Sequence, residues 1–228
     1  MKILLVSATI LEIRPLLTHL EFIRKGSDYL DHYRSGKTEI DVLIPGIGMA
    51  INAYHLGKQL ASVKYDAAIN AGICGSYSKS LKPGTVLEVV EDRFPELGTE
   101  DGEEFINVFE LGLSDRDMFP FERGILSNKS MLGSETLKLL KKVNGNTVNT
   151  INGNHRSIEK VKALFPADVE TMEGAAFFYS CLSDKIPCTQ IRSVSNFVAE
   201  RSLAKWDIPL AVKNLNKVLK KIVEEIMI

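Results

Sequence analysis

Residues 67–76 have the sequence AAINAGICGS, in which a short apolar run passes directly into a glycine-rich segment. The run Ala67–Ala71 predicts a strand buried in a sheet, and Gly72–Ser76 predicts a loop that follows it. Glycines let a backbone approach a ligand closely and present N–H groups, so this loop fits a structural turn and a ligand loop equally well. The continuous apolar run Ile3–Ala8 predicts another strand that is buried on both faces.

Strands and helices alternate along the rest of the chain. Further strands are expected at Tyr29–Ile44 (an antiparallel pair around Ser35–Lys37), Gly84–Asp92, Arg123–Leu126, Thr147–Ile151 and Thr189–Val194. Helices are expected at Leu11–Phe22, Ala50–Ser62, Ser134–Lys142, Arg156–Leu164, Met172–Ser183 and Ile208–Ile226. This alternation predicts an α/β fold of three layers, α/β/α, around a central mixed sheet. We expect one domain over residues 1–228, with the polar stretch 93–120 as a long excursion that serves function or an interface.

Composition narrows the class of protein. The chain has 228 residues, of which 45% are hydrophobic and 25% charged, and its formal net charge is −1. That balance gives no basic surface for nucleic acid, and no apolar stretch is long enough to span a membrane. Cys74, Cys181 and Cys188 lack the spacing of a zinc site, so we expect reduced thiols in a cytoplasmic protein, with no metal and no cofactor.

Polar side chains follow several of the expected strands. Glu12 comes after the first strand, and Ser195 and Asn196 come after Thr189–Val194. In open α/β sheets ligands bind at the carboxyl ends of the strands, so these residues are candidates for one site. Each also has a structural interpretation, because Glu12 fits a helix surface and Ser195-Asn196 fits a turn. The pair Gly46-x-Gly48 is by itself more typical of a turn.

Glu173 stands between a strand and a helix of small residues. A glutamate there is favoured by the helix dipole alone, but its carboxylate can also accept hydrogen bonds from both vicinal hydroxyls of a sugar. We expect Arg192 to pair with this carboxylate and keep it ionised. Cys74 has no evident base beside it and is expected to be unreactive.

Taken together, these motifs resemble the nucleoside phosphorylase/nucleosidase superfamily. The resemblance covers nearly the whole chain and rests on Glu12, Gly46–Gly48, Gly72–Ser76, Met172-Glu173 and Arg192-x-x-Ser195-Asn196. It is strongest to the small hydrolytic branch that includes the methylthioadenosine/S-adenosylhomocysteine nucleosidases. Within that branch the futalosine hydrolases of menaquinone biosynthesis are the most similar, through Val148–Thr150, Glu170–Ala176, Arg201 and Trp206–Ile208.

The resemblance implies a role for each matching position. Glu12 would activate water as general base, Glu173 would bind the ribose hydroxyls, and Asn196 would hold the purine at N7. The remaining positions of the implied site are Met172 under the ribose, Ile73, Cys74 and Gly75 on the sugar and water side, and Ile151, Arg192 and Ser195. The related nucleosidases place an aromatic side chain against the purine near Ile151, and this chain has none there. Phe197 or Trp206 is the expected substitute, and Arg201 is the candidate for binding the benzoate of futalosine.

Asn196 and the glycine segment bear on the substrate and the nucleophile. The adenine-directed members carry aspartic acid at this position, whereas the Asn196 amide can donate both to N7 and to a 6-oxo group. This favours hydrolysis of futalosine with release of hypoxanthine. A phosphorylase would use arginines to hold phosphate, but Asn70 and Ile73 stand here, so water is the expected nucleophile. Three alternatives remain open. The chain could be another nucleosidase, which acts on inosine, aminodeoxyfutalosine or methylthioadenosine/S-adenosylhomocysteine. It could also be a phosphorylase or a non-catalytic nucleoside-binding protein. We expect a small-molecule nucleoside partner, no nucleic acid, and a homo-oligomer.

Overall fold

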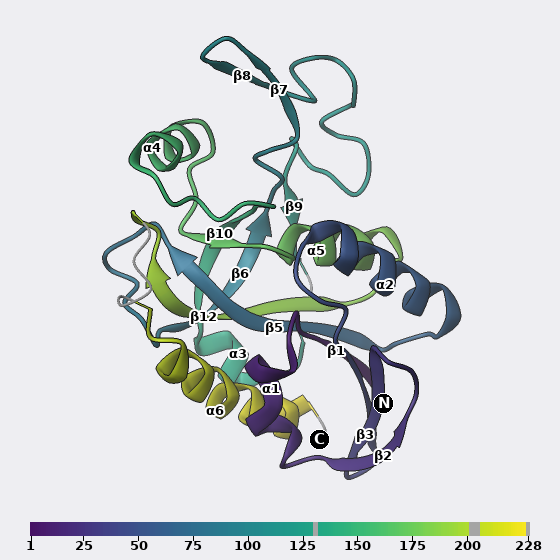
Figure 1. Ribbon diagram of the computed structural model, residues 1–228. Helices are drawn as coiled ribbons and strands as arrows, with labels where there is room; N and C mark the ends of the chain where they lie inside the picture. Colours follow the sequence, from purple (N-terminus) through teal and green to yellow (C-terminus); the bar gives the residue numbers. More distant parts are fainter. Residues whose placement is uncertain (130–131, 201–205, 227–228) are drawn as a thin grey trace.

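A mixed sheet of ten strands runs through the computed structural model, which describes residues 1–129, 132–200 and 206–226 (Figure 1). Its strand order is β11-β10-β6-β12-β5-β1-β4-β3-β2, with β9 beside β6. The strands are β1 (Lys2–Val6), β2 (Glu21–Lys25), β3 (Leu30–Ser35), β4 (Thr38–Leu43), β5 (Ala67–Ser76), β6 (Val86–Asp92), β9 (Leu126–Ser127), β10 (Lys141–Thr147), β11 (Val169–Thr171) and β12 (Cys188–Phe197). Because β11 also pairs with β5, the strands β5, β12, β6, β10 and β11 form a closed ring.

Helices cover both faces of this sheet, which confirms the predicted three-layer fold. The helices α1 (Ile10–Leu17), α3 (Glu135–Leu139) and α6 (Ile208–Ile226) lie on one face, and α2 (Met49–Ser62) and α5 (Gly174–Ser183) lie on the other (Figure 1). Strand β1 shows why its sequence is continuously apolar. Ile3 and Leu5 belong to the core under α1 and α6, whereas Leu4 and Val6 belong to the core under α2 and α5.

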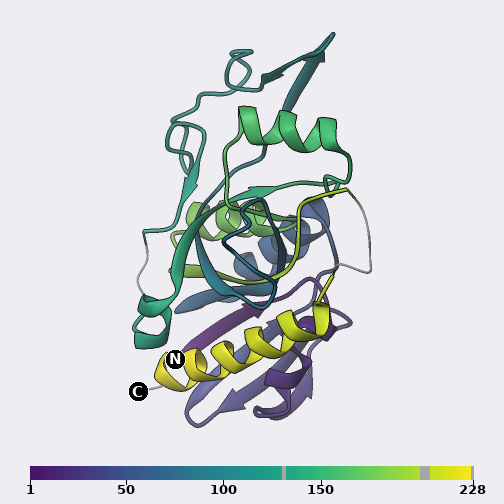
Figure 2. The same ribbon diagram turned by 90° about the vertical axis from the view of Figure 1, so that its left-hand side faces the viewer.

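The excursion contains a small sheet of its own. Strands β7 (Gly98–Asp101) and β8 (Glu104–Asn107) form a hairpin that projects from the main sheet beside α4 (His155–Leu164) (Figures 1 and 2). Lys160 of α4 lies 3.6 Å from Glu100, and the rings of Phe105 and Phe165 are 5.8 Å apart. Within the described ranges, no helix has both the length and the apolar character that a membrane span requires.

Several predicted boundaries were wrong. The helix predicted at Leu11–Phe22 ends at Leu17, and Glu21–Lys25 forms an exposed strand whose apolar residues gave a false helical period. The helix predicted at Ser134–Lys142 is only α3, and β10 occupies Lys141–Thr147, so Thr147 ends a strand instead of beginning one.

Two predicted loops are strand as well. Residues 72–76 continue β5, and Ser195 and Asn196 lie inside β12. These segments are rich in turn-forming residues, but each pairs with a neighbouring strand, and those long-range hydrogen bonds override the local preference.

Candidate active site

One cavity brings together most of the residues that the sequence nominated. It has a volume of about 290 Å³ and lies where β1, β5 and β12 end. That volume is close to the lower limit for small-molecule sites. The predicted residues that line it are Glu12, Ile73, Cys74, Gly75, Ile151, Met172, Glu173, Ser195 and Asn196. Trp206, one of the two expected stacking residues, also lines the cavity. The other lining residues were not predicted: Ala8, Thr9, Leu11, Ile47, Glu170, Thr171, Ile208 and Val212.

Glu12 is held by backbone groups at the start of α1. Its Oε2 accepts from the N–H of Thr9 at 2.9 Å and from the Thr9 hydroxyl at 3.0 Å. Its Oε1 accepts from the N–H of Ile73 at 3.0 Å, which ties the first turn of α1 to β5. The side chain is buried, yet it lines the cavity. Glu12 therefore serves the helix start as a capping residue and presents a carboxylate to the cavity at the same time.

Glu173 lies immediately before α5, and the loop before α2 reaches it. Its Oε1 accepts from the N–H of Gly48 at 2.9 Å. Gly48 has φ of 104°, a conformation that favours glycine, so the Gly46-x-Gly48 turn is what aims this N–H at the carboxylate. Burial raises the pKa of Glu173, whereas the charge of Arg192 and the Gly48 hydrogen bond lower it. Burial outweighs these two effects, so the carboxyl group lines the cavity with a raised pKa.

Asn196 lies beside a bulge of β12, where the register with β5 shifts between Val194 and Asn196. Bulges re-aim side chains and are common next to active sites. Asn196 Nδ2 donates to the carbonyl of Phe197 at 3.0 Å, and Asn196 Oδ1 accepts from the Ser195 hydroxyl at 2.7 Å. Because a carbonyl oxygen can only accept, the amide orientation is fixed, and one N–H of Nδ2 remains for a ligand.

The chain was compared with known proteins, and no protein-family model matches it. It is 26% identical over 184 residues to the futalosine hydrolase of Thermus thermophilus, a match that covers 79% of each chain. It is 28% identical over 174 residues to the 5'-methylthioadenosine/S-adenosylhomocysteine nucleosidase of Colwellia psychrerythraea, covering 72% of this chain and 70% of the relative. The native structure of futalosine hydrolase from Helicobacter pylori has a similar fold, with a TM-score of 0.79 at 19% identity and coverage of 98% and 97%. The chain is thus similar in sequence to a futalosine hydrolase and to a nucleosidase, and it shares the fold of a futalosine hydrolase. The resemblance stated from the sequence is thus confirmed.

One predicted contact of the candidate site was wrong. Arg192 and Glu173, both in the described part of the chain, form no ion pair, and Arg192 does not line the cavity. Its Nε donates to Gln190 Oε1 at 2.9 Å, and its Nη2 donates to the side chain of Asn70. The side-chain amides of Gln190 and Asn70 therefore hold the buried guanidinium, whose Nη1 lies against Gly72.

Gln190 extends this contact into a buried polar chain. Its Nε2 donates to Asp92 Oδ2 at 3.1 Å, while Thr147 donates to Asp92 Oδ1 at 2.9 Å. Burial raises the pKa of Asp92 to about 6, although its hydrogen-bond donors and the charge of Arg192 lower it. Arg192 does not line the cavity, but its positive charge lowers the pKa of both Asp92 and Glu173.

Glu170 is a residue of the cavity that sequence reasoning missed. It belongs to the Glu170–Ala176 motif, which by itself indicated no role for it. Its Oε2 accepts from the Tyr77 hydroxyl at 2.5 Å and from the side chain of Asn152, and its Oε1 accepts from the N–H of Asn152 at 3.1 Å. Its place two residues before Met172, within the short strand β11, was the signal that could have identified it.

The other predicted residues have mixed outcomes. Trp206 lines the cavity, whereas Phe197 does not, so only Trp206 is placed to contact a base there. Arg201 lies outside the described residues. Burial raises the pKa of the Cys74 thiol to about 12, which agrees with an unreactive cysteine.

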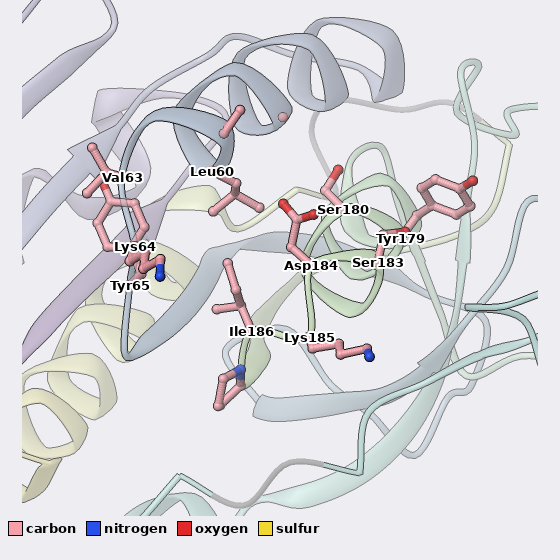
Figure 3. Close-up of a pocket in the computed structure, with 13 residues that line it drawn as sticks. Leu60, Val63, Lys64, Tyr65, Tyr179, Ser180, Ser183, Asp184, Lys185 and Ile186 are labelled. Atoms are coloured by element: carbon pink, nitrogen blue, oxygen red, sulfur yellow. The ribbon is translucent and has the colours of Figure 1, made fainter.

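A second, larger cavity of about 640 Å³ lies between α2 and α5. Figure 3 shows its lining, which includes Leu60 from α2, Tyr179 from α5, and Asp184 and Lys185 from the turn after α5. None of the predicted site residues contributes to it. Size alone therefore does not identify the active site, which the converging carboxylates and Asn196 mark better.

Proposed function

We propose that this chain hydrolyses the N-glycosidic bond of a purine nucleoside with a 6-oxo base, and that futalosine is its substrate. The observation that carries the proposal is the fixed Asn196 amide, whose free N–H is directed toward a cavity. Glu12 and Glu173 line the same cavity. The remaining N–H of an amide held this way suits an acceptor of hypoxanthine, either N7 or the 6-oxo group. Release of hypoxanthine from futalosine would place the enzyme in menaquinone biosynthesis.

The reaction joins water to the anomeric carbon and breaks the bond from that carbon to N9 of the base. Glu12 takes a proton from the water as its oxygen attacks, and the electron pair of the broken bond goes to the departing purine. The Glu173 carboxylate holds the ribose hydroxyls near the positive charge that develops on the sugar. Asn196 stabilises the negative charge on the purine, and one such donor contributes roughly 3–4 kcal/mol.

Water is favoured over phosphate as the nucleophile by the charge of the cavity. Its described lining includes the carboxylates of Glu12, Glu170 and Glu173 and no lysine, arginine or histidine. Phosphate binding depends on cationic side chains or clustered N–H groups. A lining with three carboxyl groups and no cationic side chain disfavours a phosphate anion and accommodates a neutral water.

The test is a substrate panel without phosphate. Futalosine, aminodeoxyfutalosine, inosine and methylthioadenosine are incubated with the protein, and the released base is measured by liquid chromatography. Hypoxanthine from futalosine at the highest kcat/KM supports the proposal. Preferred cleavage of methylthioadenosine would favour an adenine-directed nucleosidase, and turnover only after phosphate is added would indicate a phosphorylase.

We further propose that the chain forms a homo-oligomer through α2. Ile47, Ile51 and Tyr54 are 53%, 48% and 63% exposed, and their spacing places them on one side of the helix and the turn before it. Ile47 also lines the active-site cavity, so a partner packed on this stripe would cover the mouth of that cavity. An apolar stripe of this kind is typical of an interface.

Light scattering coupled to gel filtration tests this association. Ile51→Lys should yield a monomer with lower nucleosidase activity, because a charge in the stripe opposes burial. Leu139→Lys is the matched control, since Leu139 on α3 is 87% exposed and lies on the opposite layer. A wild-type protein that is monomeric at assay concentration would contradict the proposal.

A further inference from the structure

Glu170, Gly75 and Asn196 form one row across three neighbouring strands. Glu170 of β11 is the register partner of Gly75 in β5, and Asn196 of β12 is the partner of Gly75 on the other side. Residues in one row of a sheet direct their side chains to the same face, and all three line the active-site cavity. Two strand spacings, roughly 10 Å, therefore separate the backbones that carry the carboxylate and the amide.

Gly75, in the middle of this row, has no side chain, so its neighbours pack against its backbone. A Cβ at that position would lie 3.5 Å from Asn196 Nδ2 and 2.9 Å from a methyl group of Val198. Glu170 and Asn196 line the cavity from the two ends of the row. A planar base in the cavity between them would have one edge toward Asn196 and another toward Glu170.

The hydrogen bonds of Glu170 leave it one free acceptor site. Each carboxylate oxygen can accept about two hydrogen bonds. Oε2 takes one from Tyr77 and one from the Asn152 side chain, while Oε1 takes only the N–H of Asn152. With three donors fixing it, the carboxylate presents the remaining lone pair of Oε1 as an acceptor. The N–H of Asn152 is already used and cannot serve the ligand.

We propose that Glu170 is a specificity-determining residue that accepts the N1–H of a 6-oxopurine held in the cavity between Glu170 and Asn196. This inference rests on the proposed function, since it assumes that the purine of the substrate occupies the cavity. Hypoxanthine carries a hydrogen on N1 and an acceptor at position 6, which match Glu170 and Asn196. Adenine has an acceptor at N1, which would face the carboxylate without a hydrogen between them, and a site built for a donor strongly rejects an analogue that lacks it.

Binding of free bases by calorimetry tests the inference on the unaltered protein. Hypoxanthine, 1-methylhypoxanthine and adenine are titrated into the wild-type enzyme. Loss of a hydrogen bond to a buried carboxylate should weaken binding of 1-methylhypoxanthine and of adenine by roughly 10- to 100-fold relative to hypoxanthine. Equal binding of the three bases would overturn the inference.

A pair of variants separates base recognition from positioning of the loop. Glu170→Gln should reduce the preference for hypoxanthine over adenine by roughly tenfold or more, because the amide weakens the acceptor and adds a donor. The control is Glu96→Gln, since Glu96 holds the same loop through the N–H groups of Asn149 and Thr150 but does not line the cavity. It should leave the preference unchanged. If Glu170→Gln weakens both bases equally, the residue only positions the loop and the inference is wrong.

These measurements need no turnover, so they remain interpretable whatever the substrate panel gives. Failure of the panel to release hypoxanthine would overturn the proposed function. Hydrolysis of a 6-oxopurine nucleoside, together with equal binding of hypoxanthine, 1-methylhypoxanthine and adenine, would overturn the role of Glu170 alone.

Discussion

The Ser195 hydroxyl lies 2.7 Å from Asn196 Oδ1, so these two neighbouring side chains contact each other beside the bulge of β12. The same hydroxyl lies 3.1 Å from the carbonyl of Cys74, so it is held between β12 and β5. The carbonyl of Phe197 occupies one N–H of the amide. Asn196 is thereby pre-organised as a donor toward the cavity, which reduces the ordering cost of binding.

Asn196→Asp should invert the base preference. At neutral pH the carboxylate would oppose the Phe197 carbonyl and repel the N7 and 6-oxo acceptors of hypoxanthine. We expect kcat/KM for the 6-oxopurine nucleoside to fall by roughly 100-fold or more relative to a 6-amino analogue, because a buried mismatch is strongly penalised. Asn154→Asp is the control, since Asn154 caps α4 and aspartate caps as well. An unchanged ratio of kcat/KM values would argue against contact between Asn196 and the base.

Glu12→Gln should abolish hydrolysis while a nucleoside still binds. An amide cannot take the proton of water, and loss of a general base reduces kcat by roughly 100- to 10,000-fold. The N–H of Thr9 donates to one carboxylate oxygen and the N–H of Ile73 donates to the other, so the NH2 of a glutamine would face one of these donors. The melting temperature should therefore be measured alongside kcat. Glu39→Gln on the exposed part of β4 is the control. Turnover above one tenth of the wild-type rate would show that the base assignment is wrong.

The sequence predicted which residues lie together better than it predicted the strand boundaries. Glu12, Glu173 and Asn196 lie far apart in the chain, but each was placed near the end of a strand, and strand ends meet at one edge of such a sheet. That rule holds even though β5 and β12 extend through the segments that were interpreted as loops. Pairing of residues 72–76 with β11 and β12 depends on partners about a hundred residues away, which local propensity does not register.

The partner of Arg192 could not be predicted for a related reason. Its guanidinium binds Asn70, which lies 122 residues earlier in the sequence, and Gln190 on its own strand. From the sequence alone Glu173 is the expected partner of Arg192. In the fold, however, the Arg192 side chain is directed toward Asn70 and Gln190. The role of Glu170 could not be predicted because its carboxylate is held by Tyr77 and Asn152, which lie 93 and 18 residues away in the sequence.

Gly72→Ala should impair both stability and catalysis. A Cβ there would lie 2.3 Å from Nη1 of Arg192 and 2.8 Å from Oε1 of Glu12, so at least one of these groups must move. Overpacking of this kind costs about 1–3 kcal/mol. We expect a lower melting temperature and a reduced kcat. Gly133→Ala is the matched control, because a Cβ at Gly133 meets nothing within 4 Å. Wild-type kcat in Gly72→Ala would show that the site tolerates displacement of both groups.

Asp92 should make the stability of the protein depend on pH in a definite direction. Its pKa in the folded protein is about 6, above the ordinary value of 3.8, chiefly because the carboxyl group is buried. Between these two values the folded state binds more protons than the unfolded state, so the contribution of Asp92 to stability falls as pH rises from about 4 to about 6. Urea denaturation over this pH range measures the effect.

Asp92→Asn should remove that part of the pH dependence while disturbing Arg192. The new amide must turn its Nδ2 toward Gln190, which then has to reverse its own amide and place Nε2 against Nε of Arg192. Two donors would face each other, so we expect lower stability near pH 7 and a lower kcat. Asp28→Asn, on an exposed turn, should leave both the pH profile and kcat as in the wild type. A profile for Asp92→Asn that still declines between pH 4 and 6 as steeply as the wild type would assign the effect to another buried carboxyl group, with Glu170 and Glu173 as the next variants to measure.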